Sequence, residues 1–321
     1  MKKVFLTLAV FVMAICANAQ TNQYFWYNGN LMMGNPIAQI DSVTFGEGEP
    51  VDTLHIMLPR TIIKTVHDTV IKIVHDTVCP NDIPEGALAG EFSVSATKKV
   101  RFSKGNLQYQ ASTDTWRFAE NQYDYIGKAN ENISSTYSGW LDYFCWGTGN
   151  NPLLYSLDVS VYSFFTEWGN NLNINNSNYH WRTLTKDEWQ YLFSGRPDAE
   201  TLCGNAQINN INGFIFLPDN FIAPQNIIFH PQASSYNSNI YSIEEWQELE
   251  KVGALFLPAA GGRNSESTYS YNVNQFGHYW SATVSETSGE AYQIDYWEPE
   301  FKIRSYPVNT GQSVRLVLDI Q

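Results

Sequence analysis

The chain has 321 residues, a net charge of −13, 15% aromatic residues and only 16% charged residues. The shortage of Lys and Arg argues against nucleic acid and anionic membrane surfaces as partners, because both attract cationic side chains. The aromatic content predicts a folded chain with at least one large domain, and excludes a disordered acidic tail.

The first 19 residues have the features of a secretory signal peptide. Lys2 and Lys3 precede an apolar run over residues 4–16, and Ala17 and Ala19 are the small residues of a cleavage site. The run is shorter than the roughly 20 residues that span a bilayer, and no later stretch is long and apolar enough. We therefore expect export to the cell surface, periplasm or exterior without membrane insertion. A lipoprotein signal ending at Cys16 is the alternative.

Residues 20–87 divide into two parts. Residues 20–50 predict a small β segment, a hairpin whose strands at 24–27 and 40–45 flank a turn at 28–30. In residues 51–87, the sequence at 65–72 is echoed at 73–78 with a period of eight, and β-branched residues dominate. This pattern predicts an extended repeat linker or stalk. A bare strand edge there predicts self-association through residues 65–78.

Residues 88–321 predict an α+β domain with two main helices, short strands and long ordered loops. The helices are expected at 185–195 and 242–253, because Thr185 with Glu188 and Ser242 with Glu245 each form a capping box. Each helix precedes a short strand that ends in proline, at 214–218 and 254–258. The side chains expected to face inward from the helices are Trp189, Leu192, Phe193, Trp246 and Leu249.

Four motifs in this domain resemble a known family. The sequence WRTLTKDEW at 181–189 resembles the "WRLPTxxEW" motif of formylglycine-generating-enzyme-type domains, a branch of the C-type-lectin-like fold. Residues 253–263, 277–283 and 311–317 fit the same group. Together the motifs are similar to a large family of secreted gut-bacterial proteins. The resemblance covers residues 90–321 and implies a fold, whereas function depends on the site.

The same resemblance argues against catalysis. The related enzymes hold copper with a cysteine pair near the C-terminus, but no cysteine follows Cys203 here. The late histidines His180, His230 and His278 lack the spacing of a metal site. We expect no enzyme activity, cofactor or metal, with a formylglycine-generating-type oxidoreductase as a distant alternative. Cys145 and Cys203 could form a disulfide or remain two buried thiols, and both possibilities stay open.

In C-type-lectin-like domains the late loops build the ligand face, which corresponds to residues 291–306 here. This stretch is dense in Tyr and Trp with charges between them, the residue types of binding hot spots. Strand alternation predicts Tyr292, Ile294 and Tyr296 facing inward. The candidate ligand-binding residues are Gln293, Asp295, Trp297, Glu298, Phe301, Arg304 and Tyr306. Of these, alternation places Gln293, Asp295 and Trp297 at the surface.

The sequence therefore predicts an exported, non-catalytic binding protein of adhesin or lectin-like type. Its expected partner is a glycan or a surface protein. The alternative is a structural or tip subunit of a cell-surface assembly, in which the same face would bind a neighbouring subunit.

Overall fold

The computed structural model describes residues 83–172 and 180–320 in full, and before them the backbone of six short strands between residues 22 and 71. The chain divides into two compact units, Met1–Asp82 and Ile83–Gln321. Each unit is described by itself. The predicted signal peptide at 1–19 lies outside the described residues.

In the first unit one sheet has the strand order β2-β1-β3-β4. The strands are β1 (Asn22–Tyr27), β2 (Asn30–Pro36), β3 (Ile56–Leu58) and β4 (Thr61–Ile62). Tyr27 pairs with Asn30, so β1 and β2 form an antiparallel hairpin, and residues 28–29 between them lie outside the described residues. Its second strand is β2, however, and the strand expected at 40–45 lies outside the described residues.

The repeat at 65–78 holds a second hairpin. β5 (Val66–His67) pairs antiparallel with β6 (Val70–Ile71). The chain thus reverses within the first copy of the repeat, where a single extended strand is expected from the sequence. The reversal satisfies backbone groups that one extended strand would leave unpaired. The second copy, residues 73–78, lies outside the described residues, so the stalk and its self-association stay predictions.

The second unit contains two α-helices, both at the predicted places. α1 (Lys186–Gln190) continues into a π-helical turn, η6 (Tyr191–Gly195), and α2 spans Ile243–Lys251. Both capping boxes are formed, with Thr185 and Ser242 as N-caps. Trp189, Leu192, Trp246 and Leu249 are buried and Phe193 is partly buried, which confirms the predicted inward faces.

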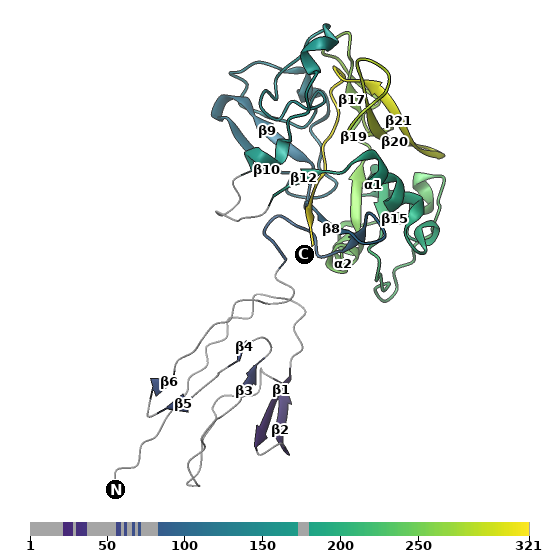
Figure 1. Ribbon diagram of the computed structural model, residues 1–321. Coiled ribbons are helices and arrows are strands. Elements are labelled where there is room, and N and C mark those ends of the chain that lie inside the picture. The colour runs from purple at the N-terminus through teal and green to yellow at the C-terminus, as the bar shows by residue number, and fades with distance from the viewer. Residues whose placement is uncertain are drawn as a thin grey trace. The chain divides into compact units, whose positions relative to one another are not determined.

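The described residues of the second unit also form five sheets, and Figure 1 labels many of their strands. The first has the order β12-β22-β8-β7, with β12 (Arg182–Thr183), β22 (Leu316–Asp319), β8 (Lys99–Phe102) and β7 (Phe92–Ser93). The second has the order β10-β9-β11, with β10 (Thr115–Phe118), β9 (Leu107–Gln110) and β11 (Trp140–Leu141).

The third sheet has the order β15-β13-β14-β16, with β15 (Ile240–Tyr241), β13 (Cys203–Ile208), β14 (Ile211–Phe216) and β16 (Leu255–Pro258). β14 and β16 confirm the two strands predicted after the helices. The others are the pair β17 (Gly262–Arg263) and β18 (Ser270–Tyr271), and the sheet β19-β20-β21. Short 3₁₀ turns η2–η5, η7 and η8 lie at Ala111–Thr113, Gly127–Glu131, Val159–Tyr162, Trp168–Asn171, Ala199–Thr201 and Tyr236–Ser238.

The two ends of the second unit meet in one sheet. β22, the last strand, lies between β12 and β8, the latter near the start of the unit. Leu316 and Val317 on β22 are fully buried in two different hydrophobic clusters. The architecture is a mixture of many short strands and two α-helices, so the α+β class is confirmed at this coarse level.

Cys145 and Cys203 are both free and buried. They belong to different hydrophobic clusters. The alternative of a disulfide is therefore wrong, and the alternative of two separate buried thiols is confirmed. Among the described residues, no helix has the length and apolar character needed to cross a membrane.

Candidate functional site

The predicted ligand face lies on a three-stranded antiparallel sheet. Its strands are β19 (Gly277–Val284), β20 (Glu290–Trp297) and β21 (Glu300–Pro307), with β20 in the middle. Asp295 pairs with His278 on one side and with Lys302 on the other. Since side chains alternate along a strand, Gln293, Asp295 and Trp297 share a face with Lys302, Arg304 and Tyr306.

The expected exposure of Gln293 and Asp295 is wrong, because both are fully buried. β20 is the central strand, and residues 311–313 pack close to this face: the Gln312 amide donates to Gln293 Oε1. The inner face follows the prediction only in part. Ile294 and Tyr296 are buried, but Tyr292 is half-buried, with the Lys186 ammonium 4.3 Å from its ring centroid.

Asp295 is the ionic anchor of this face. One carboxylate oxygen bonds to His278 Nδ1, and the other accepts hydrogen bonds from Arg304 Nε and Nη2. A carboxylate without exposed surface needs such partners, since burying an unpaired charge is very costly. Because two nitrogens of Arg304, Nε and Nη2, contact the same oxygen of Asp295, the plane of the guanidinium is fixed.

Two aromatic rings lie beside this fixed cation. The Arg304 guanidinium carbon lies 5.1 Å from the Trp297 ring centroid and 6.0 Å from that of Tyr306. Trp297 also stacks on Phe276, with ring centroids 5.3 Å apart and an interplanar angle of 10°. We call Phe276, Trp297, Arg304 and Tyr306 the aromatic–cation ladder. The Lys302 ammonium lies 5.3 Å from the Trp297 ring centroid and adds a second cation.

The ladder remains accessible to a ligand. Trp297 and Tyr306 are half-buried, while 43% of the Arg304 side chain is exposed. Cation–π contacts and the buried carboxylate hold these side chains in place before any ligand arrives. The ladder therefore combines accessible surface with a fixed geometry.

Glu298 and Phe301 are not part of the ladder. Glu298 lies in the turn between β20 and β21, and its Oε1 accepts hydrogen bonds from Ser235 Oγ at 2.8 Å and from the Tyr236 backbone N–H. Phe301 projects from the other face of β21 and stacks on Phe193. The structure thus brings together five of the seven predicted residues, of which Gln293 and Asp295 are buried supports. Glu298 and Phe301 lie apart from these five.

Sequence reasoning missed two members of this surface. Lys302 could have been found, because it has the same strand parity as Arg304 and Tyr306. Phe276 carries no such signal, since it precedes β19 and lies outside residues 291–306. His278 is buried on β19.

The accessible groups of this surface are aromatic rings and the two cations Lys302 and Arg304. Among residues 83–172 and 180–320, no group of three or more His, Cys, Asp or Glu side chains is arranged to hold a metal ion. No family model, curated protein or solved structure matches the chain.

Proposed function

We propose that this chain is an exported, non-catalytic binding protein of adhesin or lectin-like type, which recognises a glycan or a surface protein through the aromatic–cation ladder. Export rests on the signal-peptide features of residues 1–19. The four motifs at 181–189, 253–263, 277–283 and 311–317 support the finer fold that we propose for residues 88–321, a C-type-lectin-like domain.

The observation that carries the proposal is the fixed position of Arg304 beside two aromatic rings. Trp, Tyr and Arg are the residues that dominate binding hot spots. Asp295 occupies Nε and Nη2 of Arg304, which leaves Nη1 to donate to a ligand acceptor. Because the side chains are already ordered, binding costs less conformational entropy than it would on a loose surface.

The ladder suits ligands that combine flat apolar and polar groups. The half-exposed rings of Trp297 and Tyr306 can pack on the C–H face of a sugar or on an apolar side chain. Arg304 can hydrogen-bond a hydroxyl, carbonyl or carboxylate oxygen beside it. These contacts recognise a surface and need no reactive group.

A glycan-array screen of the full-length secreted chain tests the proposal. We expect a bound glycan whose affinity falls by about tenfold or more in Trp297→Ala, the effect of removing a hot-spot residue. Phe164→Ala is the matched control, since Phe164 is an aromatic residue with 84% exposure outside the ladder. Glycan binding that survives in Trp297→Ala would refute the ladder as the site. A folded protein that binds no glycan would leave a surface protein as the ligand class.

A second candidate function, a structural or tip subunit, is favoured by a separate surface. Residues 157–164 expose Leu157 (68%), Val161 (48%) and Phe164 (84%) within eight residues. Several large apolar side chains exposed in one short segment are typical of protein–protein contact sites. If it joins subunits, Phe164→Asp should shift an oligomer to monomer in light scattering at micromolar concentration, whereas a monomeric wild-type chain would refute this candidate.

A further inference from the structure

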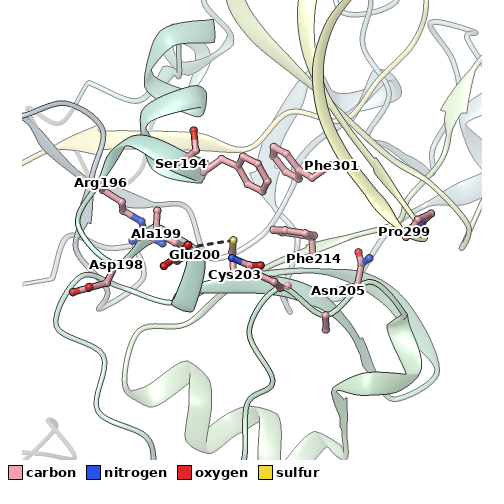
Figure 2. A pocket seen from close by; sticks show the side chains of 14 residues that line it. Ser194, Arg196, Asp198, Ala199, Glu200, Cys203, Asn205, Phe214, Pro299 and Phe301 are labelled. Carbon is pink, nitrogen blue, oxygen red and sulfur yellow. Dashed lines mark hydrogen bonds between the residues drawn. The ribbon is translucent and has the colours of Figure 1, made fainter.

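A cavity of about 580 Å³ lies on the side of β21 away from the ladder (Figure 2). It is lined by η6, η7 and the first residues of β13, by Phe214 on β14, by the loop at 232–233, and by Pro299 and Phe301 at the β20–β21 turn. Its volume falls within the roughly 300–1,000 Å³ typical of small-molecule sites. Four chain segments that are distant in sequence thus build one concave surface.

One wall of the cavity is aromatic. Phe193 and Phe301 stack with ring centroids 4.1 Å apart and an interplanar angle of 13°, and Phe214 lies 4.9 Å from Phe301. The three rings come from η6, β14 and β21, and Figure 2 shows Phe301 above Phe214 at the cavity. Such a wall fits the apolar body of a ligand.

Asn205 adds a hydrogen-bond acceptor without a partner. It is 1% exposed, and its Nδ2 donates to the Ser234 carbonyl at 3.2 Å, which fixes the orientation of the amide. Its Oδ1 is buried and makes no hydrogen bond within the described part of the chain. In Figure 2 the Asn205 amide points away from β13 toward the space beneath Pro299. A buried acceptor of this kind favours a ligand that brings a donor.

The accessible charges of the cavity are negative. Asp198 and Glu200 are exposed, and neither forms an ion pair within residues 83–172 and 180–320. Arg196 also lines the cavity, but its side chain has no exposed surface and pairs with Asp219 at 3.2 Å. Its guanidinium faces Phe92, with 5.8 Å between the guanidinium carbon and the ring centroid. Although Arg196 Nη2 has no partner, the groups that a ligand meets first are the two carboxylates.

Cys203 gives the cavity no nucleophile. Burial raises the pKa of this thiol to about 11, although the nearby Arg196 charge acts against the rise. The thiol is therefore protonated at neutral pH, and only a thiolate attacks electrophiles or binds metals well. Binding in this cavity is thus non-covalent.

We propose that this cavity is a second binding site, separate from the ladder, which takes an organic cation with an apolar body and an ammonium or guanidinium end. The phenylalanine wall contacts the body, Asn205 Oδ1 accepts a hydrogen bond from a donor on the ligand, and Asp198 and Glu200 attract its charge. The site does not depend on the proposed function of the ladder.

Three probes with one body and different ends test the charge preference. These are 3-phenylpropylamine, 3-phenylpropan-1-ol and 3-phenylpropionate, titrated against the full-length chain by ligand-observed NMR. We expect the amine to bind about tenfold more tightly than the alcohol, and the propionate to bind most weakly. Equal binding of all three probes, tighter binding of the propionate, or no binding of the amine at millimolar concentration would overturn the proposal.

Paired variants locate the site. Asp198→Asn with Glu200→Gln should lower the affinity for the amine about tenfold and leave that for the alcohol unchanged. The matched control is Glu244→Gln with Glu286→Gln, which changes the net charge equally at two exposed positions that do not line the cavity. An equal loss in both double variants would assign the effect to net charge and overturn the site. Trp297→Ala should leave amine binding intact, which separates this site from the ladder.

Discussion

At the scale of single residues, Asp142 is a fully buried carboxylate. It accepts hydrogen bonds from Asn130 Nδ2 at 2.7 Å and from the Ile126 backbone N–H at 3.0 Å. Within residues 83–172 and 180–320 it pairs with no Lys, Arg or His. Burial therefore raises its pKa to about 6, although the bonds from Asn130 and Ile126 act in the opposite direction. The folded state holds this proton to a higher pH than the unfolded state does.

The raised pKa predicts a loss of stability as the pH rises. The folded chain binds more protons than the unfolded chain between pH 4 and 6, so the free energy of unfolding falls across this window. The contribution of Asp142 is about 3 kcal/mol, from about two pKa units at 1.36 kcal/mol each. In Asp142→Asn, the free energy of unfolding measured with urea at pH 4, minus that measured at pH 7, should be lower than in the wild-type chain by about this amount. An unchanged difference would show that Asp142 titrates normally.

The ladder shows how far single residues are predictable from sequence. Period-two alternation correctly groups Gln293, Asp295 and Trp297 on one face of β20. It cannot predict their burial, because the cover comes from Gln312 and its neighbours, which approach through tertiary contacts. Glu298 and Phe301 are separated from the ladder by the turn and by strand parity. Strand parity alone could have separated Phe301 from Arg304 and Tyr306, whereas the place of Glu298 depends on where the turn between β20 and β21 falls, which the sequence does not specify.

At the scale of elements, the helix starts are local signals. The Ser242 hydroxyl accepts a hydrogen bond from the Glu245 N–H at 3.2 Å, while the Glu245 carboxylate accepts from the Ser242 N–H at 2.8 Å. Four adjacent residues therefore specify where α2 begins, which explains why both helices were predictable. The pairing of β5 with β6 was not predictable from the sequence, because each strand has only two residues and the repeat fits an extended strand equally well.

The capping box at α2 gives a second stability prediction. Ser242→Ala removes the acceptor for the Glu245 N–H and should lower the free energy of unfolding by about 1 kcal/mol. Ser242→Asp restores an acceptor and adds a charge that the helix dipole favours, so it should recover most of the loss. Ser238→Ala, at an exposed position outside the helix, is the control. A loss in Ser238→Ala as large as in Ser242→Ala would contradict the role of the cap. Urea denaturation at pH 7 measures all three variants.

At the scale of the whole molecule, we expect the second unit to need its last strand and to fold without the first unit. β22 lies inside its sheet, between β12 and β8, and its residues Leu316 and Val317 are fully buried. Residues 1–82 form a separate unit. The C-terminal six residues should therefore matter far more for folding than the N-terminal 82.

Two truncations test this asymmetry by calorimetry. Residues 83–321 alone should melt cooperatively within about 3 °C of the corresponding transition of the full chain, because a domain with its own core folds independently. Deletion of residues 316–321 should abolish that transition. It splits the β12-β22-β8-β7 sheet and opens two hydrophobic clusters. The resulting loss would exceed about 5 kcal/mol, a large part of the stability of a typical domain. A cooperative transition that survives the C-terminal deletion would show that β22 covers a sheet which is already stable without it.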